Sequence, residues 1–296
     1  MSKLTKRESN AGYVSEFEWM FKCPLCDESM NVVDLKSLIC HNHHTFDFTK
    51  QGYLNLTTRS IKTKYSKELF EARRKVIAKD GFFEPLSRTI AESLKNQVAK
   101  ENLVILDTGC GEGSHLVNLC DLVRTHFEKT VVGVGIDLSK EGIFVAAKNY
   151  SNYIWAVADL AKTPFRDGQF DVILNLLSPS NYAEFNRLLR PDGLVIKVVP
   201  QNGYLKELRL ALFDEPEKQS YSNHETVDLF NEHYQMVSSS RVQYAMSLNQ
   251  DSIQSLLQMT PLTWNASKER VQSFLERETA EITVDLEVLV GKRKSE

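Results

Sequence analysis

Five short apolar runs, several followed by segments with helical spacing, constrain most strongly what the larger part of this chain can fold into. They are LVILD at 103–107, TVVGVGID at 130–137, YIWAVAD at 153–159, FDVILNLL at 170–177 and LVIKVV at 194–199. Strands that alternate with helices predict a parallel, doubly wound α/β sheet. The runs MVSSSRVQYAMSL at 236–248 and AEITVDLEVLVGKR at 280–293 predict a final antiparallel strand pair.

A glycine turn follows the first run. Asp107 ends that strand, Gly109, Gly111 and Gly113 come next, and Ser114 opens a segment with helical spacing. Glycines here let ligand atoms approach backbone N–H groups at a helix N-terminus, which suits a nucleotide-like cofactor. A glycine pattern alone is weak evidence, and Ser114 stands where the dinucleotide-binding pattern has its third small residue.

The next two runs also end in acids. Asp137 can accept hydrogen bonds from both hydroxyls of a ribose, and Asp159 lies where an adenine amino group can be recognised. A single acid in such a place could merely close its strand. Three in order, beside the glycine turn, favour S-adenosylmethionine as the cofactor.

A metal site is predicted before these strands, in FKCPLCDESMNVVDLKSLICHNHHTFDF at 21–48. Cys23 and Cys26 have the spacing of one ligand-bearing turn, and Cys40 supplies a third thiolate. His41, His43 and His44 all lie near Cys40, and His44 is favoured because a second turn needs intervening residues. A Cys3His set predicts zinc, and four protein ligands make it structural because no coordination position stays open for water or substrate. A redox pair would not need the third cysteine and the histidine.

Charge is distributed unevenly along the 296 residues. Residues 1–80 carry a net +4 against −7 for the remainder, and nine basic residues lie between Lys50 and Lys79 with only two acids. Such a segment is either a solvated surface or one that contacts phosphates. Its position after a metal site favours nucleic acid. The candidate phosphate contacts are Lys62, Lys64, Lys67, Arg73, Arg74 and Lys75.

Cysteine use predicts a reducing compartment, because three of the five cysteines are assigned to metal and Cys110 and Cys120 remain unpaired. No apolar run reaches membrane-spanning length, and the polar start MSKLTKRESN lacks the apolar segment of a signal peptide. We therefore expect a cytoplasmic protein without membrane association.

Several motifs resemble those of class I methyltransferases: LDTGCGEG, GIDLSK, PFRDGQFDVILN and RPDGLVIKVVP. CPLC, CHNHHTFDFTKQGYLNL, EARRKVIAKDGFFEPL and LLQMTPLTW make the chain similar, from Phe21 onward, to the bacterial RlmA-type 23S rRNA (guanine-N1)-methyltransferases. The resemblance implies a Rossmann-like seven-stranded sheet with a small N-terminal zinc-binding domain. NLLSP, which begins at Asn175, is similar to the Gram-positive (RlmA(II)- or TlrB-like) branch.

The resemblance also implies residue roles. Cys23, Cys26, Cys40 and His44 would hold zinc. The cofactor residues would be Phe83, Asp107, Gly109, Gly111, Gly113, Ser114, Asp137, Asp159, Leu160, Asn175 and Tyr204. The family often has Tyr at the position of Phe83 and His at that of Tyr204. Asn175, Ser178 and Pro179 are candidates for the substrate pocket, and the catalytic residues remain unknown because no general base is identified.

The same resemblance implies the substrate and the division of the chain. The substrate would be a guanine, methylated at N1, in a hairpin loop of domain II of 23S rRNA, and a loop nucleotide must be splayed out to reach a pocket. Some relatives are associated with macrolide resistance, and a homodimer is expected. We divide the chain into an N-terminal extension (1–20), a zinc-binding RNA-recognition domain (21–60), a basic helical connector (61–100) and the methyltransferase domain (101–296).

Two other functions stay open at this point. One is a small-molecule S-adenosylmethionine-dependent methyltransferase whose zinc site is only a structural brace, and the basic segment argues against it. The other is a non-catalytic RNA-binding protein, and the complete glycine turn with Asp137 and Asp159 argues against that.

Overall fold

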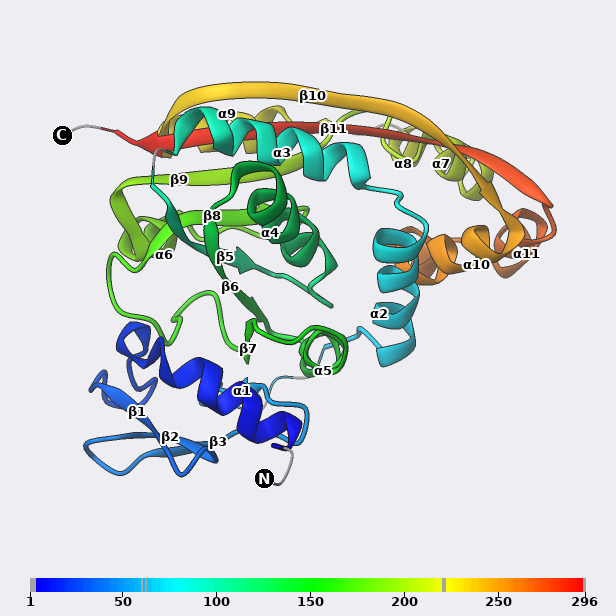
Figure 1. Cartoon of the computed structure of the whole chain (residues 1–296). Helices are drawn as coiled ribbons and strands as arrows, with labels where there is room; N and C mark the ends of the chain where they lie inside the picture. Colours follow the sequence, from blue (N-terminus) through cyan, green and yellow to red (C-terminus); the bar gives the residue numbers. More distant parts are fainter. Residues whose placement is uncertain (1–3, 60, 62, 99, 220–221, 295–296) are drawn as a thin grey trace.

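A mixed β-sheet runs through the computed structural model, which describes residues 4–59, 61, 63–98, 100–219 and 222–294 (Figure 1). Its strands are β4 (Leu54–Asn55), β5 (Asn102–Thr108), β6 (Thr130–Asp137), β7 (Ile154–Val157), β8 (Phe170–Leu176), β9 (Leu189–Pro200), β10 (Tyr234–Asn249) and β11 (Thr279–Arg293). The spatial order is β10-β11-β9-β8-β5-β6-β7-β4.

Strands β4 to β9 pair in parallel, whereas β11 pairs antiparallel with both β9 and β10. The parallel core and the final antiparallel pair confirm the fold class predicted from the sequence. Seven of these strands come from residues 102–293, and the short β4 adds an eighth beside β7. All of β8 is buried, as expected where helices cover both faces of a parallel sheet.

Helices cover both faces of the sheet. One face packs against α3 (Glu84–Gln97), α4 (Ser114–Phe127), α5 (Lys140–Asn149), α7 (Lys206–Leu212) and α10 (Gln250–Met259). The other packs against α1 (Lys6–Ser15), α6 (Tyr182–Leu188) and α9 (His224–His233). The remaining helices are α2 (Lys67–Arg74), which continues as a π-helix at Lys75–Lys79, α8 (Pro216–Gln219), α11 (Lys268–Leu275) and the 3-10 turns Glu18–Met20 and Pro261–Asn265. No helix of the described residues has the length and apolar character needed to cross a bilayer.

A small N-terminal unit, residues 4–59, lies at one end of the molecule, at the bottom of Figure 1. It contains α1 and the three-stranded antiparallel sheet of β1 (Met30–Val33), β2 (Ser37–Cys40) and β3 (Thr45–Asp47). Thr5 and Glu8 form a capping box at the start of α1, and the buried Asn10 side chain donates to the carbonyl of Gly52 at 2.7 Å. Residues 6–15 are therefore an ordered helix tied to the rest of this unit.

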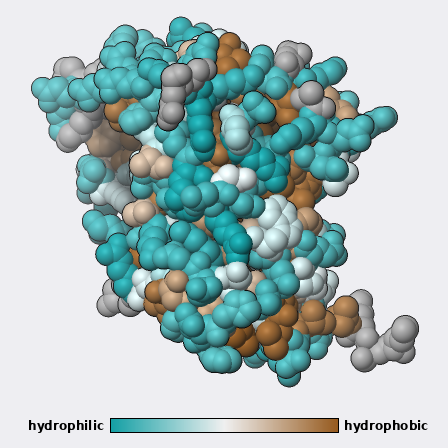
Figure 2. All heavy atoms as spheres, turned by 90° about the vertical axis from the view of Figure 1, so that its left-hand side faces the viewer, coloured by the Kyte–Doolittle hydropathy of each residue, from teal (hydrophilic) through white to brown (hydrophobic). Residues whose placement is uncertain are grey.

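The side of the molecule shown in Figure 2 is mainly hydrophilic, and hydrophobic atoms gather at its lower end, at the level of the N-terminal unit. Exposed apolar side chains of this unit are Leu4, Trp19, Leu25 and Val33. A unit of this size has a small core, so it leaves more apolar surface in contact with water.

The loop between β7 and β8 connects the N-terminal unit to the large sheet. The backbone N–H of Lys22 donates to the carbonyl of Pro164 at 3.0 Å, and that of Arg166 donates to the carbonyl of Met20 at 2.9 Å. The rings of Phe21 and Phe165 are in contact at 5.2 Å between centroids, and both are fully buried. The unit is thus joined to the sheet by backbone hydrogen bonds and by apolar packing.

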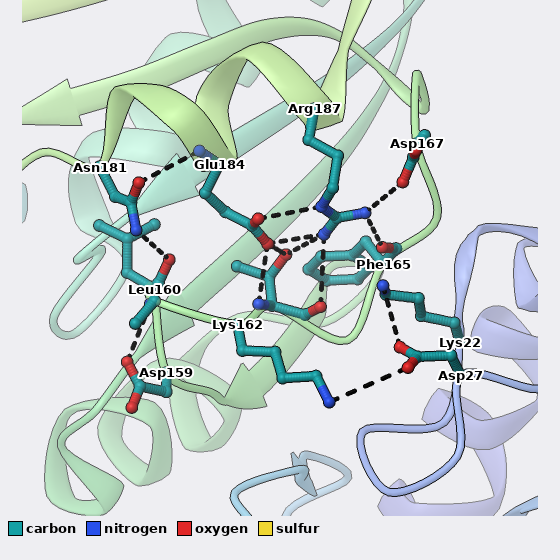
Figure 3. A network of polar contacts seen from close by, with 12 residues as sticks. Lys22, Asp27, Asp159, Leu160, Lys162, Phe165, Asp167, Asn181, Glu184 and Arg187 are labelled. Carbon is teal, nitrogen blue, oxygen red and sulfur yellow. Dashed lines mark hydrogen bonds and ion pairs between the residues drawn. The ribbon is translucent and has the colours of Figure 1, made fainter.

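Ion pairs surround this junction (Figure 3). Asp27 in the N-terminal unit faces Lys22 at 3.0 Å and Lys162 of the β7–β8 loop at 4.0 Å. Arg187 of α6 binds Glu184 and Asp167, each at 2.6 Å, and it also donates to the carbonyl of Phe165 at 2.7 Å. The guanidinium of Arg187 therefore fixes the same loop from the side of the large sheet.

Candidate functional site: a metal centre and a large cavity

Two tight turns bring the four predicted metal ligands together. The N–H of Asp27 donates to the carbonyl of Cys23 at 2.8 Å, and the N–H of His43 donates to the carbonyl of Cys40 at 2.9 Å. Asp27 and His43 each adopt a left-handed conformation, with φ of 60° and 62°. Each turn presents the side chains of its flanking residues to the same point.

The ligand atoms of Cys23, Cys26, Cys40 and His44 all lie within 4.8 Å of one another. The sulfurs of Cys26 and Cys40 are 3.7 Å apart, and Nδ1 of His44 is 3.5 Å from the sulfurs of Cys23 and Cys40. Tetrahedral zinc, with bonds of about 2.3 Å to sulfur and about 2.0 Å to nitrogen, would separate two sulfurs by about 3.8 Å and sulfur from nitrogen by about 3.5 Å. The donor set therefore fits zinc in a closed, structural site, and His44 rather than the exposed His41 or His43 completes it.

A cavity of 1430 Å³ opens at the carboxyl ends of β5, β6, β8 and β9. Of the residues predicted for the cofactor and substrate, those lining it are Phe83, Gly109, Gly111, Asp137, Leu160, Ser178, Pro179 and Tyr204. Asp107, Gly113, Ser114, Asp159 and Asn175 are not among its lining residues. The volume exceeds the roughly 300–1,000 Å³ of an ordinary small-molecule pocket, so it has room for a cofactor and a further planar group.

The glycine turn shapes the floor of this cavity. Gly109, Gly111 and Gly113 all have positive φ, between 57° and 83°. A Cβ on Gly113 would lie 2.4 Å from the ring of Trp155, and one on Gly109 would lie 2.8 Å from Cβ of Ser178. Gly113 thus gives the chain a left-handed turn in a packed space as it enters α4, while the loop before it borders the cavity.

Asp137 lies at the end of β6 with both carboxylate oxygens engaged. The N–H of Gly111 donates to one oxygen at 2.9 Å, and the N–H of Ser139 donates to the other at 2.7 Å. Burial raises the pKa of Asp137, and these two hydrogen bonds act in the opposite direction. Each carboxylate oxygen has a further lone pair, so Asp137 can still accept hydroxyl groups of a ribose from the cavity side.

Asp107 and Glu112 are buried beside the same turn, close to Arg73 of α2. Burial, reinforced by the charges of Asp137 and Glu112, raises the pKa of Asp107 to about 7, against the opposing effect of Arg73. Burial also raises the pKa of Glu112, although Nε of Arg73 lies 3.6 Å from its carboxylate. The cofactor turn therefore contains a concentration of acid that a bound cation would stabilise.

Asp159 and Leu160 follow β7. Asp159 forms an ion pair of 2.9 Å with Arg59 and accepts the N–H of Ala161 at 2.9 Å. The carbonyl of Leu160 accepts a hydrogen bond from Asn181 at 3.5 Å, as drawn in Figure 3. Leu160 lines the cavity, whereas Asp159 is not among its lining residues.

Phe83 and Tyr204, which the resemblance assigns to the cofactor, line the cavity together with His115, which sequence reasoning missed. Phe83 is 1% exposed and packs edge-on against the ring of His115 at 5.2 Å, and both line the cavity. Burial lowers the pKa of His115 to about 3, so its ring is neutral, and burial raises the pKa of Tyr204 to about 12. His115 lies two residues past Gly113, and that proximity was the available signal.

The substrate-pocket candidates form a hydrogen-bonded group at the end of β8. Nδ2 of Asn175 donates to Oγ of Ser178 at 2.7 Å and to the carbonyl of Pro179 at 2.9 Å. Its Oδ1 accepts from Oγ of Ser180 at 2.9 Å and from Nζ of Lys197 at 2.6 Å. Asn175 is completely buried and all its polar atoms are used within the protein. It therefore holds the loop in shape, while Ser178, Pro179, Ser180 and Lys197 line the cavity.

The predicted phosphate-binding residues divide by environment. Lys64 is exposed, Lys67 pairs with Glu71 at 3.4 Å, and Lys75 pairs with Asp251 at 2.7 Å. Arg74 lies over the ring of Tyr150 at 5.7 Å, and Arg73 lines the cavity. Lys62 lies outside the described residues. The described members therefore do not all face one surface.

Two further segments contribute to the cavity wall. Helix α9 contributes Thr226 and Leu229, and residues 259–262, which belong to the motif LLQMTPLTW, contribute Met259, Thr260 and Leu262. Tyr65, 40% exposed, touches Trp264, 46% exposed, with ring centroids 5.4 Å apart. An exposed aromatic pair thus lies next to the cavity-lining stretch at 259–262.

Known proteins and family models match both the N-terminal unit and the large sheet of this chain. Residues 105–193 match a family model described as a methyltransferase domain, and residues 21–67 match a model described as the N-terminal part of RlmA, a zinc ribbon. A Bacillus subtilis (strain 168) protein named "Putative 23S rRNA (guanine-N(1)-)-methyltransferase YxjB" is 48% identical over 276 residues, which cover 93% of this chain and 97% of that protein. The 23S rRNA (guanine(748)-N(1))-methyltransferase of Streptomyces fradiae is 30% identical over 246 residues, or 82% of this chain and 85% of that one.

Proposed function

Because the chain belongs to the 23S rRNA (guanine-N1)-methyltransferase family, we propose that it transfers a methyl group to N1 of a guanine in a hairpin loop of 23S rRNA domain II. S-adenosylmethionine is the methyl donor, and zinc is the structural metal of the N-terminal unit. The observation that carries the proposal is the cavity of 1430 Å³, whose wall contains both the glycine turn and the Ser178–Ser180 loop.

The cofactor supplies a methyl group already activated on a sulfonium, so the protein must mainly orient a nucleophilic nitrogen and exclude water. Gly109, Gly111 and Asp137 would bind the cofactor, with Leu160 and Phe83 on its apolar side. The acids at the turn suit a cationic ligand, and Asp137 retains acceptor capacity for a ribose. The target guanine would occupy the other part of the cavity, beside Ser178 and Pro179.

Recognition of RNA is assigned to the N-terminal unit and to the basic segment that follows it. A guanine in a hairpin loop can be splayed out and stacked on aromatic side chains, and Tyr65 and Trp264 offer such a surface near the cavity. Lys64 and Lys67 are the cluster members best exposed to phosphates, whereas Glu112 holds Arg73 at the cavity. We include in the proposal a homodimer that forms a cleft for RNA, and a cytoplasmic location, which suits five cysteines without a disulfide.

The deciding experiment uses labelled S-adenosylmethionine and rRNA from a strain that lacks the enzyme. The methyl group is mapped by the reverse-transcription stop that N1-methylguanine causes. We expect one stop, at a loop guanine of domain II, in the wild-type reaction and none with Asp137→Ala. Label in a small-molecule fraction but not in RNA would overturn the proposal. Light scattering of the same preparation measures the oligomeric state.

A further inference from the structure

Lys197 is a buried lysine in an otherwise apolar strand. It is 4% exposed, lies between Ile196 and Val198 of β9, and reaches the wall of the cavity. Its Nζ donates to Oδ1 of Asn175 and to Oγ of Ser180, both at 2.6 Å, while the carbonyl of Ser178 is farther away at 3.5 Å. The amine is thus fixed by two neutral partners at the site assigned to the guanine.

Within the part of the chain that the structure describes, no carboxylate pairs with the Nζ of Lys197. Desolvation alone lowers the pKa of Lys197 to about 8, because an ammonium without a counter-ion is unfavourable in a buried site. A substantial neutral fraction therefore exists just above neutral pH.

Few titratable groups surround Lys197. Tyr182 of α6 contacts Ser180 and stacks on His233 of α9, and Glu287 of β11 accepts from Gln201 at the end of β9. None of them alters the pKa of Lys197. Asp137, Arg73 and His115 line other parts of the same cavity.

The other candidates for accepting a proton in this region are committed or too weakly basic, or, like Asp107, they are not among the residues that line the cavity. Asp137 receives two backbone N–H groups, and Asp159 is paired with Arg59 and is not among the residues that line the cavity. His115, with its pKa near 3, is a poor base. Asn175 does not titrate.

We propose that Lys197 is the general base that removes the N1 proton of the target guanine, an inference that rests on the proposed function. Neutral Nζ keeps its two donated hydrogen bonds, to Asn175 and Ser180, and turns its lone pair towards the guanine. The N1–H bond breaks and an Nζ–H bond forms. N1 keeps the electron pair and forms a bond to the methyl carbon, while the C–S bond breaks with its electrons going to sulfur. The proton on Nζ then passes to solvent.

The first test is the single-turnover rate of RNA methylation as a function of pH. For the wild type we expect a rising limb that levels near pH 8, where Lys197 becomes neutral. Lys197→Met should lower the rate at pH 7 by roughly 10²–10⁴, the usual contribution of a general base. Its remaining rate should keep rising with pH until guanine N1 itself ionises. Lys129→Met, which removes a lysine bound to two carbonyls at the opposite end of the sheet, is the matched control.

A second variant separates proton transfer from charge. Lys197→Arg keeps a positive charge that cannot be removed at these pH values, so we expect it to be as slow as Lys197→Met. Near-wild-type activity of Lys197→Arg would overturn the assignment and favour a purely electrostatic or positioning role. Binding of S-adenosylmethionine, measured by calorimetry, should change less than threefold in both variants.

A readout independent of turnover is the titration of the 13Cε resonance of Lys197 in lysine-labelled protein, assigned by its absence in Lys197→Met. A midpoint near pH 8 is expected, and a midpoint near that of exposed lysines would contradict the proposal. If wild-type protein methylates RNA and Lys197→Met matches it at every pH, only the Lys197 assignment fails. If wild-type protein transfers no label to RNA, both proposals fail.

Discussion

Asp107 shows how a single residue near the cofactor turn links protonation to stability. Its folded-state pKa of about 7 lies above the ordinary value of 3.8, chiefly because the carboxyl is buried. A raised acid pKa means that the folded state binds the proton more tightly than the unfolded state. The associated stabilisation is fully present below about pH 3.8 and is lost as the pH rises through about 7.

We therefore expect Asp107→Asn to flatten the pH dependence of stability. Between pH 4 and pH 8, the free energy of unfolding of the wild type should fall relative to that of the variant by up to about 4 kcal/mol. Urea titrations at several pH values measure the difference. Asp192→Asn, at an exposed position near the start of β9, is the control for removing one carboxylate. Parallel curves for Asp107→Asn and the wild type would contradict the assignment.

Replacement of His44 tests the metal centre. His44→Ala leaves three thiolates without the nitrogen ligand, so zinc content measured by atomic absorption should fall well below one per chain, and RNA methylation should fall with it. His41→Ala removes an exposed neighbouring imidazole and should retain both zinc and activity. Unchanged RNA methylation after joint replacement of Cys23 and Cys26 would refute a role of this centre in RNA recognition.

Among single residues, the sequence predicts best those that belong to a spaced pattern. The zinc ligands follow from their spacing, and the structure brings all four together. Arg73 was grouped with phosphate contacts because it belongs to a basic run, whereas its side chain lies at the cavity beside Glu112. Lys197 carried a signal that was not used, a lysine inside LVIKVV. Burying a charged side chain in a strand is unfavourable unless partners compensate it, so a lysine in such a run indicates a special role. The tertiary structure is needed to show that the partners of Lys197 are neutral.

At the scale of elements, the turn between β5 and α4 depends on glycine at position 113. An alanine there would combine a left-handed backbone with a contact of 2.4 Å to Trp155. We expect Gly113→Ala to lower the free energy of unfolding by about 2–4 kcal/mol and to weaken cofactor binding. Gly168→Ala, with φ of 65° and no atom within 4 Å of the added carbon, should cost only about 1–2 kcal/mol. Equal losses in urea denaturation would show that strain, and not packing, limits both sites.

Elements with a strong apolar period were predictable, and polar or very short ones were not. The strands at 102–108, 130–137 and 170–176 follow continuous apolar runs. Residues 224–233 form α9, yet HETVDLFNEH is mostly polar and shows no apolar period. Phe230 is the one residue of this helix that is buried. β4 has only two residues, so no period marks it, and its pairing with β7 is determined by tertiary contacts.

At the scale of the whole molecule, the metal centre and the cavity are connected through the β7–β8 loop. Residues 164–166 of this loop bond to the N-terminal unit, and Leu160 at its start lines the cavity. Arg187 and Glu184 hold the middle of the loop through Thr163, Phe165 and Asp167 (Figure 3). Loss of the N-terminal unit would therefore free one side of the cavity wall but leave the central strands intact.

Chelation of zinc tests this connection. Structural zinc contributes on the order of 10 kcal/mol to the folding of a small domain. We expect removal by a chelator to increase amide hydrogen exchange in residues 21–59 and 160–167, while β8, β9 and β11 stay protected. RNA methylation should be lost before the large sheet unfolds, and added zinc should restore it. Simultaneous exchange in β8 would mean that the two parts unfold as one unit.

The two-residue strand β4 has a consequence for how the protein is made. Leu54 pairs with Ala156, about a hundred residues later in the chain. A ribosome that adds about 5–20 residues per second exposes the N-terminal unit for several seconds before β7 exists to receive β4. During that interval, the Phe21 surface also lacks its partner Phe165, and zinc held by Cys23, Cys26, Cys40 and His44 would constrain the nascent unit. Zinc supply during translation should therefore govern the yield of correctly assembled protein.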